Sequence, residues 1–255
     1  MSRIALSAAL ITKNEENNIL PCLETLSWAD EIIVADSGST DRTVMLARAQ
    51  GAKVIESSFV DFAAQKNLAL QNAAGDWVFF IDADERVTPE LQEQILSIVR
   101  ADRREAVYAV RRKTYLFGRL FSYTGTQDDY PIRLFPRTLA KFKQPVHEYV
   151  ETALPVLRIH APLMHHSTAN LKQYFSKLDR YLELEMRAME LNQRKAAFWE
   201  IFVRPPAKFF KLYLLKQGFR DAWEGFLFSV LSGYYDFCKY SMFYRRQNKI
   251  KRDLV

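Results

Sequence analysis

The chain has 255 residues, 49% of them hydrophobic, which is enough to bury one large core or a core with an appended region and excludes a disordered chain. Lys and Arg number 36 against 30 Asp and Glu, for a formal charge of +6. Only two cysteines are present, Cys22 and Cys238, and they lie far apart in the sequence. A disulfide framework and a zinc site are therefore excluded, and a reducing compartment is favoured.

The positive charge belongs to the C-terminal part of the chain. From Lys195 onward there are twelve Lys or Arg and five Asp or Glu, a net charge of +7, which leaves −1 for the first 194 residues. We therefore expect a nearly neutral body and a basic C-terminal segment that meet different partners.

Strand and helix patterns alternate along the body. The apolar run 4–11 is followed at once by a charged stretch without a small-residue cleavage site, so it predicts a strand rather than a signal peptide. The pattern then predicts a helix from residue 14, a strand at 31–36, a helix at 43–49, a strand at 53–56, a helix at 62–73 and a strand at 77–81. Such repetition predicts an α/β fold with a mainly parallel sheet flanked by helices.

The strand predicted at 77–81 ends in two carboxylates, Asp82 and Asp84. Because strands have a period of two residues, both side chains should lie on one side of the sheet at its carboxyl edge, where open α/β sheets bind ligands. Neighbouring carboxylates repel each other unless a cation lies between them, and a Mg²⁺ or Mn²⁺ ion that carries a diphosphate fits this requirement. The alternative is a solvated acidic turn without function.

Two further strands end in polar residues that are expected at the same edge. The first strand is followed by Thr12-Lys13-Asn14-Glu15 and the second by Asp36-Ser37-Gly38-Ser39-Thr40-Asp41. Asp36 has the chemistry to accept hydrogen bonds from a base or ribose, and Lys66 can offset phosphate charge. For Asp36 and Asp41, helix capping and turn formation are the alternative interpretation.

The ordered series ALITKNEE, EIIVADSGSTDRT, QKNLAL and GDWVFFIDADERV over residues 4–100 resembles the donor-binding half of family 2 glycosyltransferases with the GT-A fold. The later segments RLF at 133–135, VHE at 146–148 and Leu-x-His at 163–165 resemble the lipopolysaccharide core glucosyltransferases, which add glucose in β linkage to an inner-core heptose. The resemblance implies a GT-A domain over 1–168, with a donor half to about residue 100 and an acceptor half beyond it.

The resemblance also implies roles for individual residues. The nucleotide sugar would be held by Thr12, Asn14, Glu15, Asp36, Ser37, Lys66, Asp82, Asp84, Arg112 and Arg133. Asp84 is the expected principal metal ligand, with Asp82 and His165 beside it, although His166 is an alternative to His165 and either histidine can be structural. For Arg112 and Arg133, a solvated charged strand face is the alternative to contact with a diphosphate or a phosphorylated acceptor.

Inverting transfer needs a carboxylate that takes a proton from the acceptor hydroxyl. Glu148 is the first candidate and Asp129 the second. The order Gln127-Asp128-Asp129-Tyr130-Pro131 departs from the Trp/Tyr-Pro-Asp order of the family, and a turn next to proline accounts for it equally well.

From residue 169 to 255 the pattern is helical, basic and aromatic. Mostly aromatic and aliphatic residues within 174–185 recur at spacings of three and four, which predicts a helix that packs one face against the body. Pro205 and Pro206 are expected to interrupt a helix. The longest uncharged run, 225–235, is too short to span a bilayer. Aromatic residues flanked by Lys and Arg are what a helix at a membrane surface needs. The alternative is a helical subdomain whose aromatic residues form its core.

Together these features predict a metal-dependent inverting glycosyltransferase that moves a hexose, glucose by resemblance, from a UDP-sugar to a lipid-linked or lipopolysaccharide acceptor. Its expected place is the cytoplasm, peripheral on the inner face of the membrane, with no nucleic-acid partner. A polyprenyl-phosphate glycosyltransferase of the same fold and a non-catalytic nucleotide-sugar sensor are the alternatives. The donor sugar, the acceptor hydroxyl, the metal and the oligomeric state are not fixed by the sequence.

Overall fold

The computed structural model describes residues 5–127, 129–144 and 148–253, without the side chains of residues 180 and 249–253. The chain forms two compact units. The sheet unit comprises Met1–Lys113 and Asp129–His166, and the helical unit comprises Thr114–Asp128 and Ser167–Val255. The helical unit therefore includes a short segment from the middle of the chain besides the C-terminal helices.

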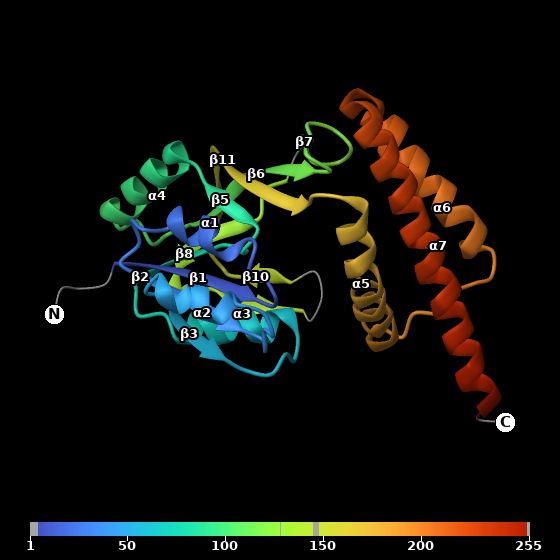
Figure 1. The fold of residues 1–255 in the computed structure, drawn as a ribbon, viewed down its shortest axis with the longest axis horizontal. Helices are drawn as coiled ribbons and strands as arrows, with labels where there is room; N and C mark the ends of the chain where they lie inside the picture. Colours follow the sequence, from blue (N-terminus) through green and yellow to red (C-terminus); the bar gives the residue numbers. More distant parts are fainter. Residues whose placement is uncertain (1–4, 128, 145–147, 254–255) are drawn as a thin grey trace. The chain divides into compact units, whose positions relative to one another are not determined.

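The N-terminal half of the sheet unit is parallel, as predicted (Figure 1). It consists of β1 (Leu6–Thr12), β2 (Glu31–Asp36), β3 (Lys53–Glu56) and β4 (Trp77–Phe80), in the spatial order β3-β2-β1-β4. The connections are α1 (Ile19–Glu24), α2 (Thr43–Ala49) and α3 (Phe62–Gln71). Thr12 pairs with Asp36 in the β1–β2 register, so the polar ends of these two strands lie at one edge.

Antiparallel strands extend the parallel half. After β5 (Glu85–Val87) and α4 (Pro89–Ala101), the strands β6 (Val107–Leu116), β8 (Ile132–Pro136) and β11 (Val156–Thr168) continue the sheet in the order β4-β8-β6-β11-β5. β8 is antiparallel to both β4 and β6, and β5 is antiparallel to β11. The short strand β7 (Arg119–Leu120) pairs with β6, and η1 (Arg137–Leu139) is a 3₁₀ turn. The strands β9 (Lys141–Lys143) and β10 (Tyr149–Glu151) form a separate antiparallel sheet.

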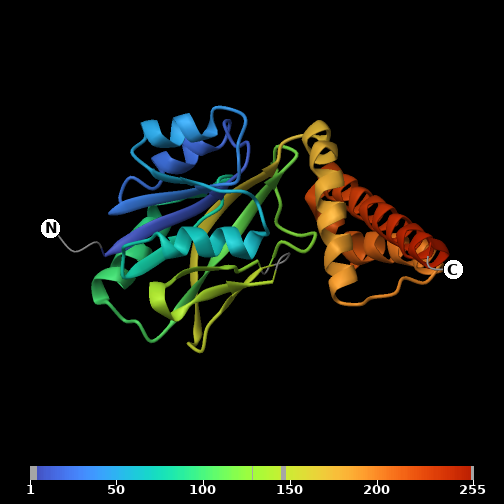
Figure 2. The ribbon, with the colours of Figure 1, turned by 90° about the horizontal axis from the view of Figure 1, so that it is seen from below.

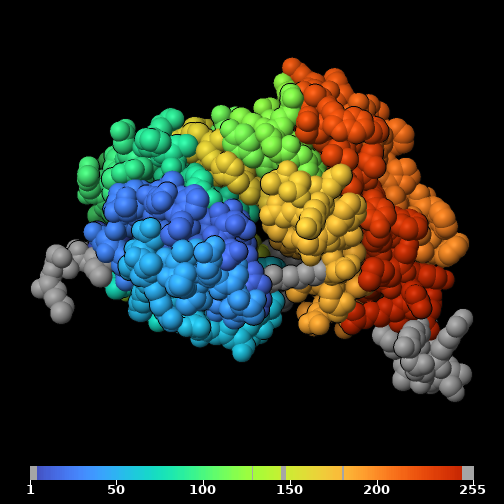
Figure 3. All heavy atoms as spheres, viewed as in Figure 1, coloured from blue at the N-terminus to red at the C-terminus, as the bar shows by residue number. Residues whose placement is uncertain are grey.

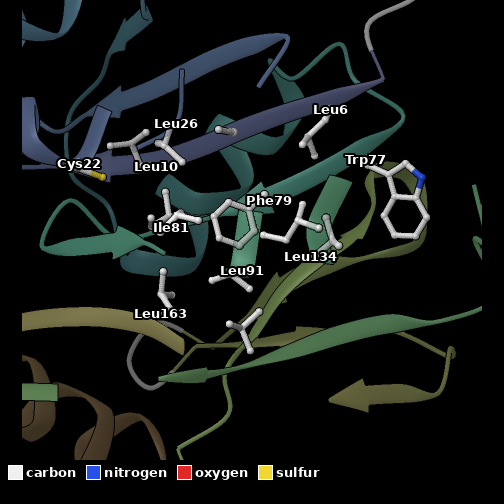
Figure 4. Packing of buried hydrophobic residues seen from close by; sticks show 14 of the residues in the cluster. Leu6, Leu10, Cys22, Leu26, Trp77, Phe79, Ile81, Leu91, Leu134 and Leu163 are labelled. Atoms are coloured by element: carbon white, nitrogen blue, oxygen red, sulfur yellow. The ribbon is translucent and has the colours of Figure 1, made fainter. Parts of the chain in front are cut away.

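The apolar core lies on both faces of this sheet, which explains why β4 has no polar residue. Trp77, Phe79 and Ile81 pack in one cluster with Leu91 (Figure 4). Phe80 belongs to the cluster on the other face. Because alternate residues point to opposite faces, a strand that is covered on both sides must be apolar throughout. Each such side chain stabilises the fold by about 1.5–3 kcal/mol relative to an exposed one. The same packing fixes the position at which the chain emerges as Asp82-Ala83-Asp84.

The helical unit contains α5 (Leu171–Leu191), α6 (Glu200–Phe210), the π-helix η2 (Lys211–Leu215), the 3₁₀ turn η3 (Gly218–Asp221) and α7 (Ala222–Asp253). α6 and α7 run side by side (Figure 2). A small buried cluster packs all three helices together, with Met186 from α5, Ile201 from α6, and Tyr240 and Phe243 from α7. Among the residues that the structure describes, no helix is both long enough and apolar enough to cross a membrane.

The expectation that Pro205 and Pro206 interrupt a helix is wrong, because both lie inside α6. The low helix propensity of proline is outweighed here by the packing of α6 against α7. Gly233 of α7 lets the backbones of the two helices approach closely. A Cβ atom on Gly233 would lie 3.0 Å from the carbonyl oxygen of Pro205, closer than ordinary contacts. Tertiary packing commonly decides helix stability in this way.

Candidate active site

The loop after β2 is organised by the carboxylate of Asp36, which is fully buried. Its Oδ1 accepts hydrogen bonds from Thr12 Oγ1 at 2.8 Å and Ser39 Oγ at 2.5 Å, and its Oδ2 accepts from the amides of Gly38 and Ser39 at 2.9 and 2.7 Å. Four donors satisfy a carboxylate that would otherwise be costly to bury. Contact between Asp36 and a nucleotide stays a prediction; in this structure Asp36 orders the loop.

The loops after β1 and β2 are joined by hydrogen bonds. The Asn14 amide donates to Ser39 Oγ at 2.8 Å, the Asn14 side-chain oxygen accepts from the Thr40 amide at 2.8 Å, and the Glu15 amide donates to Thr43 Oγ1 at 2.8 Å. Ser37 Oγ donates to the carbonyl of Thr12 at 3.1 Å. The structure therefore brings the predicted donor-binding residues of these two strand ends together as one rigid group.

Beyond the end of β4, charged side chains of opposite sign alternate in one connected group, which we call the charge network. It draws on α3, the β4–β5 turn, β5, β6, β8 and the segments before β8 and β10. In order of contact its members are Glu148, Lys66, Asp82, Arg133, Glu85, Arg112 and Asp129.

Arg133 joins the two central carboxylates of the network. Its Nη2 lies 2.6 Å from Asp82 Oδ2 and 2.5 Å from Glu85 Oε1. Although burial disfavours its charge, the carboxylates of Asp82 and Glu85 raise the pKa of Arg133 far above its ordinary value. Burial alone would raise the pKa of Asp82, but Arg133 and Lys66 hold it well below the usual range. Both groups are therefore charged at neutral pH.

Lys66 ties the network to Glu148. Its ammonium group is nearly buried and lies 2.6 Å from Glu148 Oε1 and 3.5 Å from Asp82 Oδ1. The rings of Phe80 and Phe142 lie 5.2 and 5.4 Å from the ammonium nitrogen, within cation–π range. Lys66 is thus held in one position by two carboxylates and two aromatic rings. Val146 and His147, which precede Glu148 in the VHE segment, lie outside the described residues.

Arg112 forms the other end of the network. Its Nε donates to Asp129 Oδ2 at 2.7 Å, and its Nη1 lies 3.4 Å from Glu85 Oε1. The Arg112 amide also donates to the Asp129 carbonyl at 2.8 Å. The two predicted bases, Glu148 and Asp129, therefore lie at opposite ends of one chain of ion pairs, each against a different cation.

Asp84 and His165 lie beside each other. His165 Nε2 is 3.4 Å from Asp84 Oδ2, and His165 pairs with Glu85 in the β11–β5 register. The His166 amide donates to the Asp84 carbonyl at 2.7 Å. One carboxylate oxygen and one imidazole nitrogen at this separation fit two adjacent ligands of a Mg²⁺ or Mn²⁺ ion.

The third predicted metal ligand, Asp82, is engaged by Arg133 and Lys66 instead. Across the described part of the chain, no three His, Cys, Asp or Glu side chains come together as a metal cluster. The roles of Asp84, Asp82 and His165 as metal ligands stay a prediction.

Glu85 is the central residue that sequence reasoning missed. Its side chain is fully buried, it accepts from Arg133 and Arg112, and its Oε2 also accepts from the Asp82 amide at 3.0 Å. A signal was available, because Glu85 and Val87 are two residues apart in one strand and must point to the same buried face. Sequence reasoning considered only Asp82 and Asp84, the two carboxylates just before Glu85 in the chain.

The site thus combines the Asp-x-Asp pair after β4 with the buried Lys66 of α3 and the buried Arg133 of β8, at the carboxyl edge of an α/β sheet. The family model described as "Glycosyl transferase family 2" matches residues 7–158, more than half of the chain. The chain belongs to this family.

Relatives support the family and the fold. The lipopolysaccharide core biosynthesis glycosyltransferase LpsC of Rhizobium meliloti is 27% identical over 252 residues, which covers 96% of this chain and 93% of LpsC. An uncharacterized glycosyltransferase of Rickettsia bellii is 26% identical, over 92% of this chain and 84% of that protein. Among solved structures, S. aureus TarS 1–349 in complex with UDP-GlcNAc has a TM-score of 0.50 at 16% identity. The match covers 96% of this chain and 92% of the TarS chain. The predicted GT-A fold is confirmed.

Proposed function

We propose that this protein transfers glucose from UDP-glucose, with inversion and in β linkage, to an inner-core heptose of a lipopolysaccharide acceptor. The family assigns glycosyl transfer, and the similarity to LpsC along nearly the whole chain supports lipopolysaccharide core as the acceptor. The observation that carries the proposal is the placement of Lys66 and Arg133 on Asp82, next to Asp84 and His165, at the edge where the strands end.

Donor binding in this proposal depends on charge. Asp84 and His165 would hold a Mg²⁺ or Mn²⁺ ion, which when bound supplies positive charge to the departing diphosphate. Lys66 and Arg133 are fixed before the donor arrives, so their positive charge needs no reorganisation during the reaction. Arg133 Nε is buried and has no hydrogen-bond partner among the described residues, which leaves one donor of this guanidinium unused.

Glu148 is the proposed general base. As the acceptor hydroxyl oxygen forms a bond to the anomeric carbon, the bond from that carbon to the diphosphate oxygen breaks, and Glu148 takes the hydroxyl proton. The ion pair with Lys66 fixes the direction of the Glu148 carboxylate. Asp129, held by Arg112, is the second candidate for the same role. The lipid anchor of the acceptor would place the enzyme at the inner face of the cytoplasmic membrane.

The direct test supplies the purified chain with radiolabelled UDP-glucose, UDP-galactose and UDP-N-acetylglucosamine, each with Mg²⁺, Mn²⁺ or a chelator. Heptose-terminated lipid and polyprenyl phosphate serve as alternative acceptors. We expect transfer of glucose to the heptose acceptor only, with loss of activity in chelator. Transfer to polyprenyl phosphate alone, or no transfer of any hexose, would contradict the proposal.

Variants separate donor binding from proton transfer. Asp84→Asn is expected to lose metal-dependent binding of UDP-glucose, as measured by calorimetry. The control is Asp76→Asn, which removes the charge of a carboxylate paired with Arg104 and should bind UDP-glucose normally. Glu148→Gln should keep donor binding while kcat falls about 10²- to 10⁴-fold. Glu151→Gln, an exposed neighbour paired with Lys143, is its matched control. If Asp129→Asn loses turnover and Glu148→Gln does not, Asp129 is the base.

A further inference from the structure

The helix formed by α6 and η2 has an unusual solvent-facing side. Its exposed positions recur at spacings of three and one, which define one continuous face of a helix. We call this the aromatic face, and it consists of Trp199, Phe202, Val203, Pro206, Ala207, Phe210, Lys211, Leu214 and Leu215. Lys211 is its only charged member. In the space-filling view, part of the orange segment that contains α6 lies at the surface (Figure 3).

The exposure of the large side chains is substantial. Phe202 is 61% exposed, Trp199 59% and Leu215 79%. Isolated exposed apolar residues are common, but a contiguous apolar patch on a folded chain indicates a surface that another molecule covers. The opposite side of α6 contains Arg204, whose guanidinium lies 4.8 Å from the ring centre of Tyr240 in α7. Compared with an ordinary surface helix, α6 thus has the opposite arrangement, with the cation of Arg204 directed toward the neighbouring helix and aromatic rings directed toward solvent.

The exposed charges of the segment 195–223, which contains the aromatic face, are all positive. Between residues 195 and 223 the only carboxylates are Glu200 and Asp221, and both are buried. Glu200 is bound by Arg194 and Arg204, and Asp221 accepts hydrogen bonds from Ser122, Tyr123 and Thr124. The cations of the same segment reach solvent at Lys195, Lys211, Lys216 and Arg220. No exposed carboxylate of this described segment offsets them.

From this combination we infer that the aromatic face inserts into the surface of an anionic lipid bilayer. Its apolar side chains would enter the boundary between headgroups and acyl chains, while Lys211 and Lys216 meet anionic headgroups. A second copy of this chain fits less well, because a two-fold interface over this face would bring the lysines of one copy against those of the other. The inference identifies the contact surface, which the proposed function leaves open.

The test measures co-sedimentation of the full chain with vesicles, without donor or acceptor, so its outcome does not depend on the proposed reaction. Vesicles of phosphatidylcholine alone are compared with vesicles that also contain phosphatidylglycerol, at low and high salt. We expect binding to the anionic vesicles that weakens as salt rises. Absence of binding to anionic vesicles at low salt would overturn the inference.

Paired variants locate the surface. Phe202→Gln/Phe210→Gln should weaken vesicle binding at least tenfold, since two large apolar side chains no longer enter the bilayer. Lys211→Gln/Lys216→Gln should weaken it by about fivefold for each lysine. Val60→Gln/Leu191→Gln, which alters two equally exposed apolar residues elsewhere, and Lys53→Gln/Lys172→Gln should bind as the unaltered chain does. Equal binding by the aromatic variant and its control would refute the assignment.

Two further measurements guard against misfolding of a variant and against a protein partner. In the unaltered chain, anionic vesicles should protect the exposed Trp199 of the aromatic face from quenching by acrylamide, and unchanged quenching would contradict insertion. Sedimentation velocity without lipid should show no self-association through this surface. A concentration-dependent dimer that disappears in Phe202→Gln/Phe210→Gln, together with absent vesicle binding, would mean that the face is an interface between copies.

Discussion

The sheet unit and the helical unit both depart from the rule that apolar groups lie inside and charges outside, but only the helical unit also exposes a continuous apolar face. In the sheet unit, Glu85 and Arg133 are buried at the ends of strands and satisfied by each other. In the helical unit, Phe202 and its neighbours are exposed while Glu200 and Asp221 are buried. Both arrangements are unfavourable unless partners compensate for them. For the buried charges the partners lie within the chain, whereas for the exposed rings the partner that we infer is a lipid bilayer.

This difference predicts very unequal effects of substitution on stability. Glu85→Gln should have the largest effect, because it leaves the buried Arg133 and the partly buried Arg112 with one carboxylate each, Asp82 and Asp129. We expect the free energy of unfolding to fall by about 3–5 kcal/mol, as measured by urea denaturation. Glu56→Gln, which removes an exposed ion pair with Arg48, should change it by less than about 1 kcal/mol. Equal effects of the two substitutions would contradict the central place of Glu85.

Asp82→Asn tests the same network through pH. Because the pKa of Asp82 is lower in the folded protein than in the unfolded chain, its contribution is complete above the unfolded pKa of about 4 and is lost as the pH falls toward the folded value. At pH 7 the substitution should cost about 1.5–3 kcal/mol, since it removes a hydrogen bond between charged groups. Below pH 4 the difference from the unaltered chain should shrink in thermal unfolding. A constant difference from pH 7 to pH 3 would refute this view.

Asp221 offers a buried carboxylate in the helical unit for comparison. It accepts from the Ser122 amide at 3.0 Å, the Tyr123 amide at 3.0 Å and Thr124 Oγ1 at 2.6 Å, and so holds the loop after β7. Asp221→Asn replaces one acceptor oxygen by a donor and should cost about 1–3 kcal/mol in urea unfolding. A value as large as that of Glu85→Gln would show that the two units do not differ in the way their buried charges are stabilised.

The smallest effect is expected for Phe202→Gln. Its ring is largely exposed, so the free energy of unfolding in solution should change by no more than about 0.5 kcal/mol. Loss of more than 1 kcal/mol would mean that the aromatic face supports the fold rather than an external contact. The contrast with Glu85→Gln is therefore a direct measure of the difference between the two units.

Much of the sheet unit follows from local sequence. The alternation of strand and helix patterns predicted β1 to β4 and their connections, because short, largely apolar runs are separated by helix and turn signals. The same reasoning placed Thr12, Asp36 and Asp82 after neighbouring strands. Sequence reasoning also singled out six of the seven residues of the charge network, Asp82 from its place after a strand and most of the others through the family resemblance.

The contacts among these residues were decided only by the tertiary structure. Lys66, Arg133 and Glu148 lie far apart along the chain, and only the folding of α3 and β8 against β4 brings two of them to Asp82. Nothing in local sequence distinguishes Asp82, which is held by cations, from Asp84, which faces His165. The side of α6 that faces solvent, and the continuation of that helix through two prolines, likewise depend on its packing against α7. Sequence fixes which groups are available and their periodicity, whereas pairing and burial arise from contacts between distant segments.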